Sequence, residues 1–208
     1  MTETIRSNGR KYNTKENRNR FFFPTEYIKV ENLLKQNQKH TARFLINTGA
    51  RINESRFVKV EDCDLINKRI TLKKTKCKAK KGETHGRVRI IPISSQFAAY
   101  LKKYIKDNQL SQESYLNILS TPAFNIGLKK ACQKAELKNY ADFSAHTFRK
   151  TLECWLMALG VDGLRLTAHI GHDIRTAAHH YVSPDVFTYE ERKDIRIIIG
   201  DLYGSSEK

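Results

Sequence analysis

The sequence predicts a mostly helical α+β fold with a small antiparallel sheet near the front of the chain. Two short alternating runs, 69–73 and 87–90, are typical of paired strands, and a Lys-rich stretch with two glycines separates them. Elsewhere, apolar residues recur at helical spacing over most of the chain. With 208 residues, of which 39% are hydrophobic, the chain is long enough to bury a core.

Each element follows from a local signal. Residues 1–22 are predicted to be a flexible basic arm, because six of the first 20 are Lys or Arg and few are apolar. Thr25 can cap a helix with Ile28, Leu33 and Leu34 as its apolar positions, and a second helix ends at Gly49. Further helices are expected over 95–107, 122–135, 144–159, 163–170, 174–182 and 185–199. We therefore expect an arm over 1–22, a domain over 23–184, and a C-terminal helix and tail over 185–208.

The net charge of +16 favours a polyanion, and above all nucleic acid, as the partner. Residues 68–89 contain ten Lys or Arg against Glu83, and the first 20 residues add a net +4, so most of the surplus lies in two segments. Four widely spaced cysteines give little support to a zinc site and favour a reducing, cytoplasmic compartment. Neither a signal peptide nor a membrane-spanning run is visible in the sequence.

Three polar clusters interrupt the apolar patterns. Arg51 and Glu54 lie three residues apart after Gly49, and an isolated pair of this kind would be interpreted as a surface ion pair. His146 and Arg149 have the same spacing at the start of a helix. The third cluster is Gly171-His172, which Tyr181 follows nine residues later.

Together these residue types suit phosphodiester chemistry without a metal ion. Arginines can hold the equatorial oxygens of a phosphorus transition state, and a tyrosine becomes a nucleophile once a base accepts its proton. A lysine on a hairpin could protonate the leaving sugar oxygen. The sequence contains no acidic cluster for Mg²⁺ and no P-loop or dinucleotide fingerprint.

From about residue 23 to 182, the chain resembles the catalytic domain of the tyrosine recombinases, the phage integrase and Xer-like group. Residues 48–54 (TGARINE) look like the family's TGxRxxE box, and residues 146–149 (HTFR) look like its HxxR box. Gly171-His172 and Tyr181 match the family's Gly-His pair and the nucleophilic tyrosine that follows it nine residues later. Segments 60–65, 70–76 and 89–93 are similar to the family's three-stranded sheet, and the four signatures occur in the family's order.

This resemblance implies a site-specific recombinase or integrase in which Tyr181 attacks the scissile phosphate of double-stranded DNA. A 3′-phosphotyrosyl intermediate and a free 5′-hydroxyl would result, with no metal or organic cofactor. Arg51 and Arg149 would hold the non-bridging oxygens, His146 would accept or share the tyrosine proton, His172 would hydrogen-bond the phosphate, and Glu54 would orient the surroundings of Arg51. The family's behaviour also implies a monomer in solution that forms a tetramer on paired DNA sites.

The lysine of the site is expected to be Lys76, which the strand register places where the family has its hairpin lysine. Because the hairpin is longer than usual, other lysines of its flexible tip stay open as alternatives. The remaining basic side chains are expected to contact the DNA backbone. They are Lys73, Lys74, Lys78, Lys80, Lys81 and Arg87.

Several other conspicuous residues are not assigned to the catalytic site. Trp155 is expected in the core, and the histidines His169, His179 and His180 are expected to pack or face DNA rather than bind metal. Alternative nucleophiles would be Tyr140, Tyr189 or Tyr203. The C-terminal helix matches in position one that packs on a neighbouring protomer or on its own, and the sequence leaves both modes open.

Relatives usually carry a helical core-binding domain before the catalytic one, and here only about 22 residues precede the resemblance. We therefore expect weaker, more salt-sensitive DNA binding than a two-domain enzyme shows. Two alternative functions stay open. One is a type IB topoisomerase-like DNA relaxase, and the other is a non-catalytic DNA-binding module of the same fold.

Overall fold

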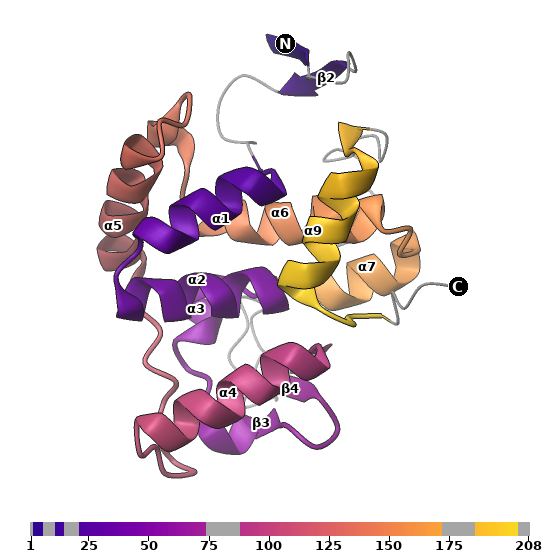
Figure 1. Ribbon diagram of the computed structural model, residues 1–208. Coiled ribbons are helices and arrows are strands. Elements are labelled where there is room, and N and C mark those ends of the chain that lie inside the picture. The colour runs from indigo at the N-terminus through magenta and orange to yellow at the C-terminus, as the bar shows by residue number, and fades with distance from the viewer. Residues whose placement is uncertain (1, 6–10, 15–20, 74–87, 172–185, 204–208) are drawn as a thin grey trace, which may run out of the picture.

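The computed structural model describes residues 2–5, 11–14, 21–73, 88–171 and 186–203 (Figure 1). Within these ranges, a body of helices lies above α4 (Ser95–Asp107) and a three-stranded antiparallel sheet. The predicted class, mostly helical α+β with one small sheet, is confirmed. The predicted helix over 174–182 and most of the basic hairpin lie outside the described residues.

The N-terminal segment contains regular structure that the sequence did not predict. Strands β1 (Thr2–Ile5) and β2 (Lys11–Thr14) pair antiparallel, with Thr2 opposite Thr14 and Ile5 opposite Lys11. The prediction of a flexible arm rested only on the small apolar surface that this segment could bury. Threonine, isoleucine and tyrosine nevertheless favour the extended backbone of a strand.

The core begins two residues before the predicted domain boundary. Phe21 and Phe22 are 2% and 0% exposed. The Phe22 N–H donates to Thr151 Oγ1 over 2.9 Å, and the Phe22 carbonyl accepts from Trp155 Nε1 over 3.0 Å. Trp155 is itself fully buried, as its helical spacing predicted. The chain is therefore fastened to α6 (Ala145–Ala158) before its first helix starts.

The first helix, α1 (Pro24–Leu33), buries a different face from the predicted one. Of the three predicted apolar positions, Leu34 is buried but Ile28 and Leu33 are exposed, whereas Tyr27 and Val30 are buried. Tyr27 meets the rings of Phe148 and Trp155 edge-on, so aromatic packing against α6 selects this face. The helix starts at Pro24, which has no N–H to satisfy, and the cap is Phe23 rather than Thr25.

The sheet has the order β3–β4–β5, with Ile70 of β4 opposite Ile91 of β5. The buried positions are Ile70, Leu72 and Ile91, whereas Val88 and Ile90 are 50% and 56% exposed. The apolar residues of the alternating run 87–90 therefore lie on the exposed face of β5. The bounds are β3 (Cys63–Asp64), β4 (Arg69–Leu72) and β5 (Arg89–Pro92).

The bounds of α2, α4, α5, α6 and α7 agree closely with the predicted ranges. The central pair is α2 and α6, which pack against each other, and α5 and α7 flank them. Ser94 caps α4 by accepting the N–H of Phe97, and Gly49 ends α2 as predicted. Leu159 is the C-cap of α6, and Gly160 follows it with a φ of 82°. The remaining bounds are α2 (Gln36–Thr48), α3 (Ile52–Ser55), η1 (Val60–Asp62), α5 (Thr121–Lys134), η2 (Tyr140–Asp142) and α7 (Gly163–Ile170).

The C-terminal helix α9 (Tyr189–Ile199) packs on α1 and α6 of its own chain (Figure 1). It starts after Thr188, four residues later than predicted, and buries Ile195 and Ile199 while Ile197 is 76% exposed. Beyond it, the Asp201 carboxylate accepts two bonds of 2.6 Å from the N–H and hydroxyl of Ser95. This contact places a negative charge at the N-terminus of α4, where the helix dipole favours it.

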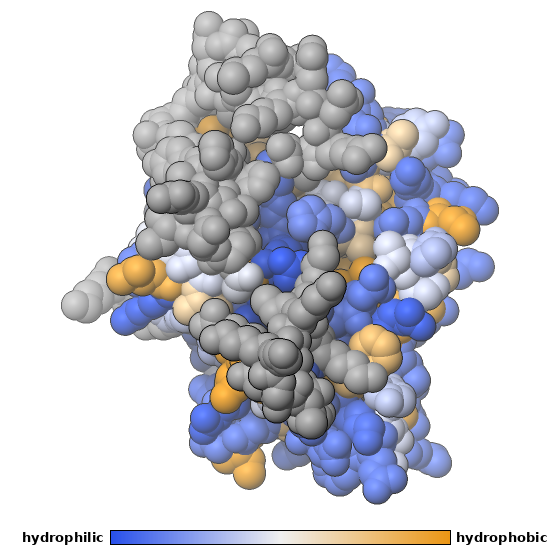
Figure 2. Space-filling model, turned by 180° about the vertical axis from the view of Figure 1, so that it is seen from behind, coloured by the Kyte–Doolittle hydropathy of each residue, from blue (hydrophilic) through white to orange (hydrophobic). Residues whose placement is uncertain are grey.

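Of the helices described, none is long and apolar enough to cross a membrane. In the reverse view of the molecule, hydrophilic residues are visible in the middle, on the right side and along the lower part of the face, with single apolar residues scattered among them (Figure 2).

Candidate active site

The site is built around the turn that joins α2 to α3. Gly49 ends α2 with a φ of 59°, and Arg51 is the N-cap of α3. Glu54 forms two hydrogen bonds with this residue. Its Oε2 accepts a bond of 3.2 Å from the Arg51 N–H, and its Oε1 accepts a bond of 2.9 Å from Arg51 Nη1. The Glu54 side chain is only 4% exposed, so the pair is not the surface ion pair that the spacing alone would suggest.

Arg149, from the first half of α6, reaches the same turn. Its Nη1 donates to the carbonyl oxygen of Gly49 over 2.8 Å, and the residue is 3% exposed. Burial, reinforced by the positive charges of Arg51 and Arg89, lowers the pKa of Arg149 to about 9. Among the residues described, Arg149 Nη2 has no hydrogen-bond partner. A buried cation of this kind is suited to receive an anion.

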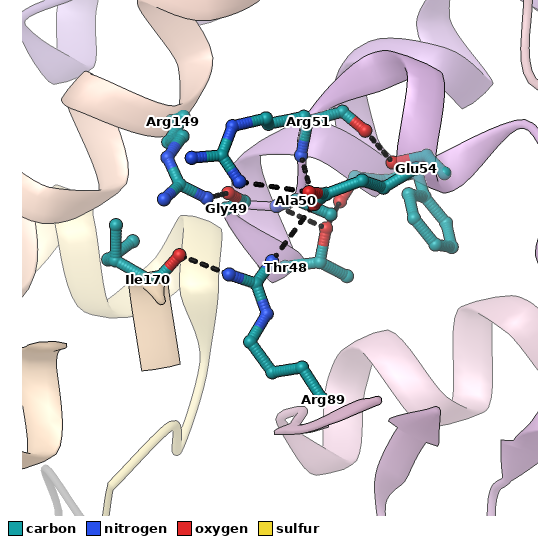
Figure 3. A network of polar contacts seen from close by, with 10 residues as sticks. Thr48, Gly49, Ala50, Arg51, Glu54, Arg89, Arg149 and Ile170 are labelled. Carbon is teal, nitrogen blue, oxygen red and sulfur yellow. Dashed lines mark hydrogen bonds and ion pairs between the residues drawn. The ribbon is translucent and has the colours of Figure 1, made fainter. Parts of the chain in front are cut away.

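A third arginine, Arg89, joins the network from β5 (Figure 3). Its Nη2 lies 3.2 Å from Glu54 Oε2, and its Nη1 donates to the carbonyl oxygen of Ile170 at the end of α7. Gly171, the next residue, has a φ of 75°, and a Cβ there would overlap the Arg89 guanidinium. The glycine of the Gly171-His172 motif is therefore required by both its backbone conformation and the approach of Arg89.

Sequence reasoning did not select Arg89 as a site residue. Its side chain points inward on the same face of β5 as the buried Ile91, two residues on. The neighbouring apolar residues Val88 and Ile90 suggested the opposite face. The sequence leaves the phase of this strand open, because in Arg-Ile-Ile-Pro either Ile90 or Ile91 could lie in the core.

A pocket of about 500 Å³ opens beside these residues. It brings together four of the predicted site residues: Arg51, Glu54, His146 and Arg149. His146 is exposed and lies in the first turn of α6, one turn before Arg149, so both side chains face the pocket. The remaining lining residues are Ala50, Ile52, Asn53, Phe57, Thr121, Asn125, Ser144 and Ala145.

Three other predicted site residues, Lys76, His172 and Tyr181, lie outside the described residues. The same is true of most of the predicted DNA-contacting side chains and of two histidines. They are Lys74, Lys78, Lys80, Lys81, Arg87, His179 and His180.

Lys73 is described, and it is held by acidic side chains of the same sheet region. Its Nζ lies 2.6 Å from Asp62 Oδ1 and 3.5 Å from Glu61 Oε1. The hydrogen bond to Asp62 raises the pKa of Lys73. Because the Asp62 carboxylate is almost fully buried, this contact fastens the end of β4 before the basic segment begins.

His169 lies in the core beneath the site. Burial lowers its pKa to about 3, so its imidazole is neutral at ordinary pH, and its Nδ1 is 2.9 Å from the Tyr203 hydroxyl. Burial in turn raises the pKa of Tyr203 to about 12, which does not suit a nucleophile. Over the described ranges, no three His, Cys, Asp or Glu side chains are grouped as they would be to hold a metal ion.

Positive charge exceeds negative charge in the described site. The guanidinium groups of Arg51, Arg89 and Arg149 interact with one another, and the Glu54 carboxylate accepts bonds from the first two. The buried carboxylate of Glu153 also acts on Arg149. The surplus positive charge faces a pocket that is open on one side, so the arrangement can bind a phosphate group and stabilise negative charge that develops on its oxygens. Fold and site together thus define a mostly helical domain with an arginine-lined pocket that can accept a phosphate group.

The chain belongs to the phage integrase family, whose sequence profile matches residues 23–186. The tyrosine recombinase XerA of Saccharolobus solfataricus is 31% identical over 150 residues, which make up 71% of this chain and 47% of the relative. The chain thus spans about half the length of this curated relative.

Solved structures of the family share the fold. The Tn1549 transposon integrase in complex with transposon right-end DNA has a TM-score of 0.65 at 16% identity, covering 89% of this chain and 67% of that one. The crystal structure of XerA recombinase has a TM-score of 0.64 at 15% identity, with 89% and 64% covered. XerH bound to its difH substrate has a TM-score of 0.60 at 16% identity, with 91% and 58% covered. Membership of the family, rather than these matches of fold, favours the recombinase class over the topoisomerase-like and non-catalytic alternatives.

Proposed function

We propose that the chain cleaves and rejoins double-stranded DNA as a site-specific tyrosine recombinase. The observation that carries the proposal is the convergence of Arg51 and Arg149, from two motifs far apart in the sequence, on one pocket that also includes His146. Family membership and the DNA-bound structural relatives support the same assignment.

In the proposed reaction, the phenolic oxygen of Tyr181 attacks the scissile phosphorus. A phosphotyrosyl bond forms at the 3′ side while the bond to the 5′ oxygen breaks. His146 accepts or shares the tyrosine proton, and a hairpin lysine, with Lys76 the first choice, protonates the departing 5′ oxygen. An incoming 5′-hydroxyl reverses these steps and reseals the strand, because the covalent intermediate retains the energy of the phosphodiester.

Arg51 and Arg149 bind the non-bridging oxygens during this step, and His172 adds a hydrogen bond to the phosphate. Glu54 holds Arg51 in place through its backbone and its side chain. The guanidinium groups supply the positive charge that a phosphorus transition state requires, so the proposed reaction uses neither a metal ion nor an organic cofactor.

The proposed DNA grip uses the basic segment around residues 74–87 and the N-terminal 20 residues. Each neutralised phosphate steepens the salt dependence of binding by ~0.9 in log–log slope. Deletion of residues 1–20 is therefore expected to reduce that slope. An unchanged slope would show that the N-terminal segment does not contact the DNA phosphates. We further propose that the chain is monomeric in solution and assembles as a tetramer on paired sites.

A nicked suicide substrate tests the reaction, because loss of a short strand traps the covalent adduct on a denaturing gel. The wild-type chain is expected to form the adduct, and Tyr181→Phe is expected to bind DNA without forming it. Tyr189→Phe is the matched control, since Tyr189 is an exposed tyrosine outside the pocket. An adduct that persists in Tyr181→Phe would identify another residue as the nucleophile.

A further inference from the structure

Arg89 connects three parts of the site that come from separate regions of the chain. It extends from β5, pairs with Glu54 of α3, and donates to the carbonyl oxygen of Ile170, the last residue of α7 (Figure 3). The motif residue His172 follows only two positions after Ile170. One guanidinium group therefore links the carboxylate that holds Arg51 to the helix end that carries the Gly171-His172 motif.

The geometry of Arg89 does not suit direct binding of the phosphate. Both of its Nη atoms are already engaged, one by Glu54 and one by Ile170, and its side chain is only 13% exposed. Arg149 differs in this respect, because its Nη2 has no hydrogen-bond partner among the described residues. A planar guanidinium with fixed donors can bridge a carboxylate and a carbonyl in a way that a single ammonium cannot.

Loss of Arg89 would affect Glu54 first. Glu54 Oε2 accepts from Arg89 and from the Arg51 N–H, while Oε1 accepts from the Arg51 side chain. Without Arg89, one oxygen of this carboxylate loses its side-chain donor, and the carboxylate can rotate away from the geometry that fixes the Arg51 guanidinium. The carbonyl of Ile170 would lose the Arg89 donor at the same time.

We propose that Arg89 is a positioning residue of the recombination reaction, which acts through Glu54 and the end of α7 to fix Arg51 and the turn at Gly171 that leads into the motif. The inference rests on the proposed function and adds a residue to its machinery. Because small displacements of catalytic groups can reduce a rate by ~10²-fold, the effect is expected on the chemical step rather than on DNA affinity.

The test compares Arg89→Gln with the wild-type chain in two separate measurements. The rate of adduct formation on the suicide substrate, at saturating protein, is expected to fall ~10- to 100-fold. DNA affinity is expected to stay within about threefold, since no phosphate contact is removed. The matched control is Arg69→Gln on the adjacent strand. Within the described ranges, the Arg69 side chain forms an exposed pair with Asp64, and both measurements should match the wild type.

Two further variants separate positioning from a merely structural role. Arg89→Lys retains the charge but can engage only one of the two partners well, so its cleavage rate should lie between those of wild type and Arg89→Gln. In a Glu54→Gln background, Arg89→Gln should reduce the rate of adduct formation by a much smaller factor than in the wild-type background, because the two residues act as one unit.

The outcomes are distinct. If the wild-type chain forms no adduct, the proposed function fails, and this inference fails with it. If the wild-type chain forms the adduct and Arg89→Gln forms it at the same rate, only the inference is overturned. Equal losses of rate and affinity, or fully additive effects of Arg89→Gln and Glu54→Gln, would likewise overturn it.

Discussion

Arg149 Nη1 donates a hydrogen bond of 2.8 Å to the carbonyl oxygen of Gly49, although the two residues are 100 positions apart in the chain. The carbonyl belongs to the C-terminal end of α2, where the helix dipole is negative and favours a cation. This bond ties the two arginine motifs to each other through the backbone. It also fixes one side of a guanidinium that lines the pocket and whose Nη2 has no hydrogen-bond partner among the described residues.

Gly49→Ala is expected to destabilise the fold by ~2–4 kcal/mol. Alanine would have to adopt a φ near 59°, and its Cβ would lie 2.8 Å from Ile170 Cδ1 in a packed region. Urea denaturation followed by circular dichroism measures the change. Gly163→Ala is the control, since a Cβ there meets nothing within 4 Å, and its unfolding free energy should match or slightly exceed that of the wild type.

Arg149→Met is expected to abolish the adduct while leaving the unfolding free energy equal to or higher than that of the wild type. The wild-type guanidinium is buried and is repelled by Arg51 and Arg89, so an apolar side chain of similar volume removes an unfavourable charge. The contrasting variant is Arg43→Met, which should destabilise the fold because Arg43 pairs with Glu31 at 2.6 Å. A loss of more than ~2 kcal/mol in Arg149→Met would contradict this interpretation.

The free energy of unfolding is expected to decrease as pH falls from about 6.5 towards 3. Burial lowers the pKa of His169 to about 3, so the unfolded chain binds a proton in this range and the folded chain does not. Between pH 7.5 and pH 5, His169 alone should account for a loss of about 2 kcal/mol. His40, whose pKa burial lowers to about 4, contributes in the same direction.

His169→Gln should therefore show a pH-induced loss that is smaller than that of the wild type by about 2 kcal/mol. Denaturation curves at the two pH values provide the measurement, and His146→Gln, at an exposed position, controls for removal of an imidazole as such. An unchanged pH dependence in His169→Gln would show that His169 is not the titrating group.

Lys73→Gln is expected to leave the salt dependence of DNA binding almost unchanged. The ammonium is held by Asp62 and Glu61, so few counterions are released through it when DNA binds. Lys78→Gln, within the predicted DNA-contacting segment, should instead reduce the log–log slope by ~0.9. If Lys73→Gln lowers the slope by as much as Lys78→Gln does, Lys73 is a phosphate contact after all.

Most of the fold could be predicted from the sequence, because its signals are local. The helix over 95–107 has a serine cap and four apolar residues at helical spacing, and it was predicted at its observed bounds. The convergence of Arg51, Glu54, His146 and Arg149 on one pocket agrees with the family resemblance that the motifs carried. Their three-residue spacings place each pair on one side of a helical turn.

The inward position of Arg89 could not be predicted, because the phase of a short strand is ambiguous when consecutive residues are apolar. Its partner Glu54 is 35 positions away, and nothing local in the sequence indicates that contact. The buried face of α1 was missed for a related reason. Tyr27 is amphipathic, and only the aromatic rings of α6 determine that it is buried while Ile28 is not.

The bond between Trp155 and Phe22 gives the chain a built-in optical probe. Trp155 is the only tryptophan in the sequence, and its indole is fully buried with its N–H bonded to the carbonyl just ahead of α1. Its emission therefore reports on one defined place, where the N-terminal segment docks on α6. A red shift that precedes the loss of helical signal would reveal that this segment detaches first, without any label being introduced.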